Sequence, residues 1–188
     1  MRVISGSARS LKLKTIEGMD TRPTQDRIKE TLFNMIQYDV AGCVFLDLFA
    51  GSGGIGIEAL SRGAAQACFV EKAKNALSCI RENLRYTKLE SKAVVMPADV
   101  MSAIGILEQQ EMVFDYIFMD PPYKKGWEPQ VLALLDRSPI CGKDTVVIVE
   151  SSLDTGIAEE DYVNLKIEKI KKYKTNKHTF LKKSQEDL

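Results

Sequence analysis

Several residue types that build common active sites are scarce in this sequence. Its 188 residues include one histidine and four cysteines, and no two cysteines form a Cys-x-x-Cys pair. This spacing argues against disulfide or zinc frameworks, and it predicts structural thiols in a protein of the reducing cytoplasm. No cluster of metal ligands is visible, so we expect no metal site. The single histidine, His178, falls in a lysine-rich tail, which predicts a core without histidine for Ser/His or Cys/His catalysis.

Long apolar segments are also missing. The sequence has no run of 18 or more apolar residues, and its N-terminus lacks the apolar core of a signal peptide. With 45% hydrophobic and 28% charged residues, the composition is ordinary for a soluble globular protein. We therefore expect no membrane association and a single domain over residues 1–188, with an N-terminal extension (1–40) before a core (41–188).

A net charge of zero hides an uneven distribution along the chain. Residues 1–29 carry a net +4, residues 30–165 a net −9, and residues 166–188 a net +5. Basic ends on an acidic middle predict that the termini form a surface for a polyanion. Lysines on a solvated face would give the same pattern, and charge alone does not separate the two interpretations.

Apolar runs and helical periodicity alternate through the middle of the chain. Short buried strands are predicted at 43–48, 67–70, 94–96, 115–119 and 145–149. Helices are predicted between them at 54–62, 73–88, 100–107 and 129–135. Repeated units of this length predict an α/β protein with a Rossmann-like, doubly wound and mostly parallel sheet.

The two ends of the chain add different elements. Partial alternation of β-branched and aromatic residues over 162–181 predicts a C-terminal antiparallel hairpin. Residues 3–4 and 11–13, around Gly6-Ser7, predict a small basic hairpin, and a helix over about 24–37 leads into the core.

A glycine-rich loop, D-L-F-A-G-S-G-G-I-G (Asp47–Gly56), follows the first core strand. In a doubly wound sheet ligands bind outside the carboxyl ends of the strands, where this loop lies. Glu71 ends the second strand twenty residues after Gly51, which suits a carboxylate that binds a ribose diol. The candidate cofactor-binding residues are Asp47, Phe49, Ala50, Gly51, Ser52, Gly53, Glu71, Lys72 and Asp99.

Two nucleotide cofactors fit this loop. Gly51, Gly53 and Gly56 satisfy the dinucleotide pattern G-x-G-x-x-G, so an NAD-dependent oxidoreductase is a competing hypothesis. Asp47 favours S-adenosylmethionine, because a carboxylate here would repel a pyrophosphate but attract the cationic methionine end. Asp99, after the third strand, is placed to contact adenine, although a helix cap is an equally good role for it.

The tetrapeptide D-P-P-Y (Asp120–Tyr123) ends the fourth strand. An exocyclic amino group is a poor nucleophile, because its lone pair is delocalised into the base. Asp120 and the carbonyl of Pro121 can accept its hydrogens, and the Pro122 ring restricts the backbone that holds them. Tyr123 can stack on an extruded base. Asp-Pro is also a common turn opener, but its place here, at the predicted sheet edge of the glycine loop, favours chemistry.

These motifs, together with R-P-T-Q-D-R-I-K-E-T-L-F-N (Arg22–Asn34) and the opening R-V-I-S-G, resemble a known family over nearly the whole chain. It is the bacterial 16S ribosomal RNA guanine-N2 methyltransferases of the small single-domain RsmD type. The resemblance implies the class I methyltransferase fold, S-adenosylmethionine as cofactor, and Asp120–Tyr123 as the residues that hold the guanine amino group. D-P-P-Y also occurs in adenine and cytosine amino-methyltransferases, so guanine rests on the resemblance.

The resemblance also implies that the basic N-terminal hairpin meets RNA. The candidate RNA-binding residues are Arg2, Arg9, Lys12, Lys14, Arg22 and Arg27. Arg22 or Arg27 would approach an RNA phosphate or the methionine carboxylate, while a plain helix start with Arg22 in solvent is the alternative. The expected partner is 16S rRNA, free or in a small ribosomal subunit, bound by a monomer.

The sequence departs from the family in its tail, where Tyr173 is followed by Lys174 rather than glycine. This departure places tail contacts in question but leaves the catalytic core unaffected. A catalytically silent RNA-binding domain that has kept the fold is the third hypothesis, beside the methyltransferase and the oxidoreductase.

Overall fold

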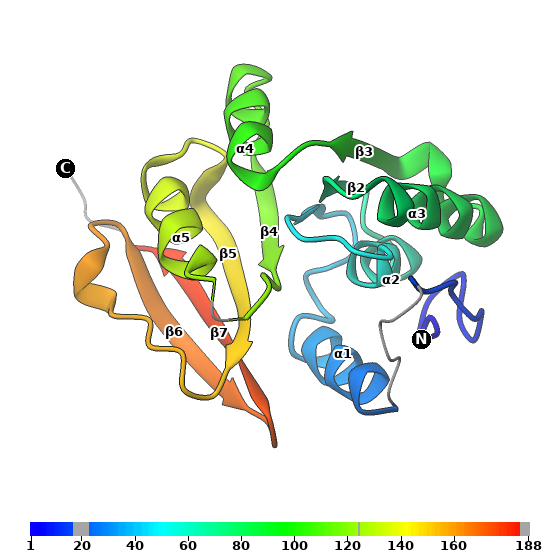
Figure 1. The fold of residues 1–188 in the computed structure, drawn as a ribbon, viewed down its shortest axis with the longest axis horizontal. Helices are drawn as coiled ribbons and strands as arrows, with labels where there is room; N and C mark the ends of the chain where they lie inside the picture. The colour runs from blue at the N-terminus through cyan, green and yellow to red at the C-terminus, as the bar shows by residue number, and fades with distance from the viewer. Residues whose placement is uncertain (17–22, 124, 185–188) are drawn as a thin grey trace. The chain divides into compact units, whose positions relative to one another are not determined.

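The computed structural model describes residues 1–16, 23–123 and 125–184. The chain forms two compact units, Met1–Asp99 and Val100–Leu188. Each unit is a sheet with its own helices (Figure 1). The expectation of one domain over residues 1–188 stays a prediction.

The first unit holds three parallel strands in the order β3-β2-β1. Its elements are α1 (Pro23–Met35), β1 (Val44–Asp47), α2 (Gly54–Ser61), β2 (Gln66–Glu71), α3 (Lys74–Thr87), the short 3-10 helix η1 (Glu90–Lys92) and β3 (Ala93–Pro97). In the sheet Phe45 is opposite Ala67 and Phe69 is opposite Val95. The strand-helix alternation expected from the sequence is confirmed for this unit.

Burial explains why these segments become strands and helices. β1 and β2 are apolar along almost their whole length, and β1 is buried at all but its first residue and β2 at all but its two end residues, as parallel strands usually are. In α3 the residues Ala76, Leu77, Ile80 and Leu84 recur at helical spacing and are buried, while the opposite face is polar. The core of the unit therefore follows from the apolar pattern.

The N-terminal segment folds back on itself as expected, although it forms only one isolated antiparallel bridge, between Arg2 and Lys12. The Val3 amide donates to the Leu11 carbonyl at 2.9 Å, and the Ser10 amide donates to the Val3 carbonyl at 2.9 Å. We call residues 1–14 the N-terminal loop.

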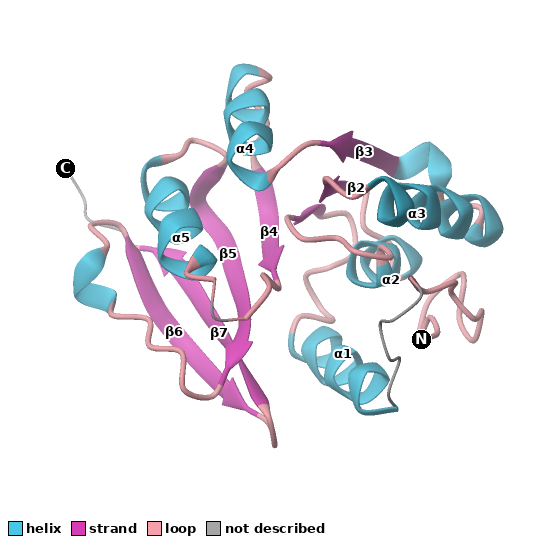
Figure 2. Cartoon of the chain, in the orientation of Figure 1, coloured by secondary structure: helices cyan, strands magenta, loops and turns pink. Residues whose placement is uncertain are grey.

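The second unit holds four strands in the order β4-β5-β7-β6, with β4 and β5 parallel and the others antiparallel. Its elements are α4 (Val100–Gln109), β4 (Phe114–Met119), α5 (Trp127–Arg137), β5 (Cys141–Ser152), the 3-10 helix η2 (Glu159–Asp161), β6 (Leu165–Lys172) and β7 (Asn176–Lys183). Figure 2 shows β6 and β7 as the expected C-terminal hairpin.

β5 is longer than the sequence suggested, because it ends at Ser152 rather than at Val149 and begins at Cys141 rather than at Thr145. Gly142, Lys143 and Asp144 are poor strand formers, so local propensity hides this part. The strand nevertheless begins here because Cys141 pairs with Phe114 of β4, and an irregularity separates this pair from the next one, Tyr116 with Val146.

Among the described residues, no helix has both the length and the apolar character needed to cross a membrane. Over the same residues, no group of three or more His, Cys, Asp or Glu side chains could hold a metal ion. All four cysteines are free and buried, and burial raises the pKa of the Cys68 thiol to about 12.

Candidate functional site

The glycine loop makes a tight turn between β1 and α2. The Gly53 amide donates to the Ala50 carbonyl at 2.7 Å, and Gly53 then caps α2 in the left-handed conformation (φ 83°). This conformation favours glycine, because a side chain there would be strained. One turn later the helix lies close to β2, where a Cβ at Gly56 would come within 2.3 Å of the Phe69 ring. Gly51 (φ 54°) and Gly53 are therefore required by the backbone conformation, and Gly56 by its close approach to the Phe69 ring.

Glu71 holds this loop against the end of β2. One carboxylate oxygen accepts the Gly51 amide at 3.0 Å, and the other accepts the amides of Lys72 and Ala73, both at 2.8 Å. An ionised carboxylate offers about four acceptor positions, so three backbone donors leave roughly one for a ligand. Glu71 therefore orders the loop in addition to offering an acceptor.

Asp47 is buried at the end of β1, with 1% of its surface exposed. One oxygen accepts the Gly56 amide at 3.2 Å, whereas the buried Oδ1 has no hydrogen-bond partner. Loss of hydration raises the pKa of this carboxyl to about 7, with a further rise from Glu71 and an opposing effect of the Gly56 and Phe49 amides. A buried acceptor left unpaired is costly, and a cationic donor would satisfy it.

The remaining predicted cofactor residues surround this turn or follow it in the first unit. Ala50 and Ser52 are buried, while Phe49 and Gly51 are half-buried. Lys72 is exposed beside Glu71, and exposed Asp99 directly precedes α4. The loop, Asp47 and Glu71 are thus joined by hydrogen bonds, while the roles of Lys72 and Asp99 stay predictions.

Asn83 was missed in the sequence, although it is tied to the same loop. Its Nδ2 donates to the Ser52 carbonyl and to the Lys14 carbonyl, both at 2.9 Å, and its Oδ1 accepts the Lys14 amide at 2.8 Å. Only 2% of this residue is exposed. The signal that could have found it is a polar residue between Ile80 and Leu84, on the buried face of α3.

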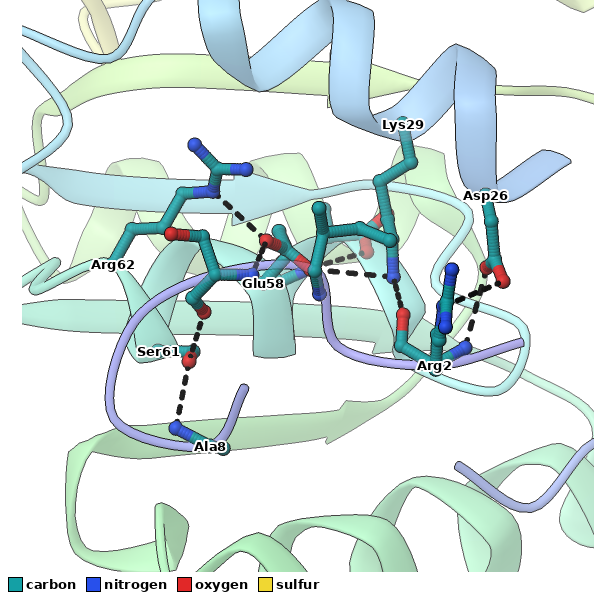
Figure 3. A network of polar contacts seen from close by, with 11 residues as sticks. Arg2, Ala8, Asp26, Lys29, Glu58, Ser61 and Arg62 are labelled. Carbon is teal, nitrogen blue, oxygen red and sulfur yellow. Dashed lines mark hydrogen bonds and ion pairs between the residues drawn. The ribbon is translucent and has the colours of Figure 1, made fainter. Parts of the chain in front are cut away.

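A buried charged network holds the N-terminal loop to α1 and α2 (Figure 3). Glu58, fully buried, accepts the amides of Ile4 and Ser5 at 2.8 and 3.0 Å. It also pairs with Arg62 at 2.8 Å and with the buried Lys29 at 3.3 Å. Burial lowers the pKa of Lys29, although Glu58 opposes this shift. The basic charge of Lys29 is therefore internal to the fold and cannot serve an RNA surface.

The predicted RNA-binding residues have different surroundings. Arg2, Arg9, Lys12, Lys14 and Arg27 are exposed, and Arg22 lies outside the described residues. Arg2 pairs with Asp26 at 3.8 Å, and Lys14 pairs with Glu82 at 2.5 Å. The Lys14–Glu82 pair raises the pKa of Lys14. Two of these cations therefore have an acidic partner within the protein.

The tetrapeptide Asp120–Tyr123 follows β4 in the second unit. Pro121 is buried, whereas Asp120, Pro122 and Tyr123 are exposed, Tyr123 by 43%. Burial of its hydroxyl end and the charge of Asp120 raise the pKa of Tyr123, so the phenol stays neutral. The tetrapeptide thus combines a rigid, buried Pro121 with two polar side chains at the surface, those of Asp120 and Tyr123.

The expectation that the core contains no histidine is wrong. His178 lies in β7 opposite Glu150 of β5, and its side chain is fully buried. The lysines around it suggested an exposed tail, but alternation along a strand sends neighbouring residues to opposite faces. His178 contacts Glu150 and Tyr173 rather than a serine or cysteine.

Three comparisons place the chain among known proteins. The family model described as "Conserved hypothetical protein 95" matches residues 1–182. The "Putative rRNA methyltransferase YlbH" of Bacillus subtilis is 40% identical over 159 residues, covering 85% of this chain and 86% of that protein. The "Ribosomal RNA small subunit methyltransferase D" of Escherichia coli is 33% identical over 157 residues, covering 84% and 77%.

Structural similarity extends over the whole chain. The solved "Putative methyltransferase yhhF" of Escherichia coli matches with a TM-score of 0.83 and 29% identity, covering 98% of both chains. The expected α/β fold class, with its parallel sheet and C-terminal antiparallel hairpin, is confirmed.

Proposed function

The chain belongs to the family described as Conserved hypothetical protein 95, the RsmD-type methyltransferases, and on that premise we propose its reaction. It transfers a methyl group from S-adenosylmethionine to the exocyclic N2 amino group of a guanine in 16S rRNA. The observation that carries this proposal is the sequence similarity to two proteins named for rRNA methylation, which are 40% and 33% identical over 85% and 84% of this chain. We further propose a cytoplasmic monomer that binds 16S rRNA, free or within a small ribosomal subunit.

The first unit supports S-adenosylmethionine rather than a dinucleotide as the cofactor. Its most specific feature is the buried, unpaired oxygen of Asp47 beside the glycine loop. The ammonium group of the methionine moiety would satisfy that oxygen, whereas a pyrophosphate would face a carboxylate. In this proposal Glu71 binds the ribose, the loop backbone lies against the methionine end, and Asp99 approaches adenine.

The second unit supplies the groups proposed for the base. Asp120 and the Pro121 carbonyl accept the two hydrogens of the amino group, which favours a pyramidal nitrogen with an available lone pair. Tyr123 stacks on the base. When bound, the cofactor supplies an electrophilic methyl on a sulfonium, so positioning and charge placement provide most of the rate. Asp120 accepts hydrogen bonds in this scheme and forms no bond to the methyl group, and the proton that the nitrogen loses on methylation passes to solvent.

Transfer of a tritiated methyl group to undermethylated 16S rRNA tests the proposal. Naked RNA and assembled small subunits serve as parallel substrates, and the product is digested and separated as nucleosides. The proposal expects label in N2-methylguanosine. Label in N6-methyladenosine or N4-methylcytidine would identify another base. No transfer from bound S-adenosylmethionine would support a silent RNA-binding domain, and binding of NAD instead would support an oxidoreductase.

A further inference from the structure

The N-terminal loop and the glycine loop both hydrogen-bond one side chain, that of Asn83 on the buried face of α3. The Lys14 amide donates to Oδ1 at 2.8 Å, and Nδ2 donates to the carbonyls of Lys14 and Ser52, both at 2.9 Å. Nδ2 also lies 3.6 Å from Sγ of Cys79, which is a weak acceptor. A backbone N–H can only donate, so Oδ1 must face Lys14, and the two hydrogens of Nδ2 serve the two carbonyls. A single amide group therefore joins the two loops.

Ser52 occupies the part of the glycine loop with the greatest conformational freedom. It lies between Gly51 and Gly53, whose φ angles are 54° and 83°. Glycine restricts the adjacent peptide planes least, so the peptide between Ser52 and Gly53 could change its orientation at low cost. Two hydrogen bonds hold this peptide. The Gly53 amide donates to the Ala50 carbonyl at 2.7 Å, and Asn83 donates to the Ser52 carbonyl. Of the two, the bond from Asn83 is the one that comes from outside the loop.

The N-terminal loop also contacts the start of α2. A Cβ at Gly54 would come within 2.3 Å of Sδ of Met1, so the Met1 side chain covers the backbone of this residue. The Leu13 amide donates to the Met1 carbonyl at 3.1 Å, which ties Met1 to the segment that carries Lys14. The same segment carries Lys12, and both lysines are exposed candidates for RNA binding. The candidate RNA surface and the candidate cofactor loop are thus in direct structural contact.

We propose that Asn83 is a positioning residue for the cofactor, because it fixes the Ser52 carbonyl and so holds the glycine loop in the conformation that binds S-adenosylmethionine. The same amide holds the backbone of Lys14, so RNA that orders the N-terminal loop also orders the glycine loop. The two ligands favour one arrangement, and each raises the affinity for the other by the same factor. The inference rests on the proposed function, since it takes the N-terminal loop as the RNA surface.

Cofactor affinity without RNA tests the positioning role. Asn83→Leu replaces the amide by an apolar side chain with the same branching, so the dissociation constant for S-adenosylhomocysteine should rise roughly tenfold by calorimetry. Thr87→Val is the matched control, because it also removes a buried polar group from α3, one that donates to carbonyls of its own helix. Its dissociation constant should equal that of the wild type. Partial unfolding would reduce the number of sites but not this constant, so a wild-type constant in Asn83→Leu would overturn the positioning role.

The coupling between the two ligands is measured from the affinity for undermethylated 16S rRNA, with and without saturating S-adenosylhomocysteine, which has no methyl group to transfer. In the wild type the bound cofactor product should tighten rRNA binding about fivefold or more, and rRNA should tighten its binding by the same factor. In Asn83→Leu, saturated at a higher concentration, this effect should disappear. Equal coupling in both proteins, or none in the wild type, would contradict the proposed link.

Hydrogen exchange keeps this inference distinct from the proposed function, because it needs neither RNA nor turnover. Bound S-adenosylhomocysteine should slow amide exchange in the glycine loop and also in residues 11–16 of the wild type and of Thr87→Val. In Asn83→Leu the slowing should be confined to the glycine loop. Equal slowing of residues 11–16 in all three proteins, or none in the wild type, would rule out the link. Wild-type protein that shows the expected pattern but transfers no methyl group to rRNA would refute the proposed function and leave the Asn83 link standing.

Discussion

The candidate cofactor site in residues 1–99 and the candidate base site in residues 100–188 are built in different ways. In the first, Glu71, Asn83 and Asp47 are hydrogen-bonded to loop or helix backbone, and Asn83 and Asp47 are buried. In the second, Asp120 and Tyr123 are exposed side chains that follow β4. The first region is ordered by the fold itself, so its residues should affect stability and affinity. The second should affect rate.

Removal of the buried anion of the first region should have the largest effect. Glu58→Ala leaves the buried Lys29 without its partner, and breaking such a pair costs about 3–5 kcal/mol in the free energy of unfolding. Urea unfolding would measure this loss. The exposed neighbour variant Glu30→Ala should change stability by less than about 0.5 kcal/mol. A Glu58→Ala protein as stable as Glu30→Ala would show that the N-terminal loop is not held by this network.

A substitution in the candidate base site should change the rate of methyl transfer and leave cofactor affinity and stability unchanged. Asp120→Ala removes an acceptor that acts on the amino group during transfer, so methyl transfer should fall by roughly 10² or more. Initial rates with rRNA would measure this, and calorimetry should find S-adenosylmethionine affinity and thermal stability unchanged. Wild-type turnover would rule out the proposed role of Asp120. A loss of stability would contradict the contrast between the two regions.

The raised pKa of Asp47 makes the first region sensitive to pH. Only the carboxylate attracts the cofactor's ammonium, so with a pKa of about 7 the affinity at pH 6 should be about tenfold below its high-pH value. The raised pKa also means that the contribution of Asp47 to stability is present at low pH and is lost as pH rises through about 7. Calorimetry would measure the affinity for S-adenosylmethionine at about pH 6 to 8, in the wild type and in Asp47→Asn. The ionisation of the cofactor itself affects both proteins equally, so it cancels in the comparison. Parallel curves for the two proteins would mean that Asp47 does not face the ammonium.

The smallest effect is expected at the exposed surface of the N-terminal loop. Arg9→Ala with Lys12→Ala should make the slope of log RNA affinity against log salt shallower, by up to about 0.7–0.9 for each phosphate that the protein no longer binds. Lys14 is a weaker candidate, because Glu82 already neutralises it. The charge-matched exposed pair Lys74→Ala with Lys92→Ala is the control. Equal slopes in both double variants would return these residues to a solvated face, and the basic hairpin β6–β7 would be tested next.

Much of the fold was predictable because it depends on local apolar patterns. The strand-helix alternation, the glycine turn and the antiparallel hairpin all follow from runs and periodicities that a sequence displays. The early start of β5 was not, since it depends on the pairing of Cys141 with Phe114 of β4, beyond three poor strand formers, Gly142, Lys143 and Asp144. Local sequence patterns do not show which separate segments of the chain will pair in this way.

The candidate site divides in the same way. Asp47, Glu71 and D-P-P-Y stand next to recognisable motifs, so the sequence identified them. Asn83 and His178 were missed or misjudged because their roles depend on partners 31 and 28 residues away. The signal that could have identified Asn83 is its position as a polar residue on an apolar helical face. The lysines around His178 concealed the second, since they alternate with it along β7.

The central claim, that the first region binds the cofactor and the second supports transfer, has a direct test. Single-turnover methyl transfer is measured over rising S-adenosylmethionine concentration, with saturating rRNA, for wild type, Glu71→Ala and Asp120→Ala. The account predicts that Glu71→Ala needs roughly tenfold or more cofactor, from a charged contact of about 1.5–3 kcal/mol, but reaches the wild-type plateau. Asp120→Ala should keep the wild-type half-saturation and reach a plateau at least about a hundredfold lower. A reduced plateau in Glu71→Ala, or an altered half-saturation in Asp120→Ala, would contradict the account.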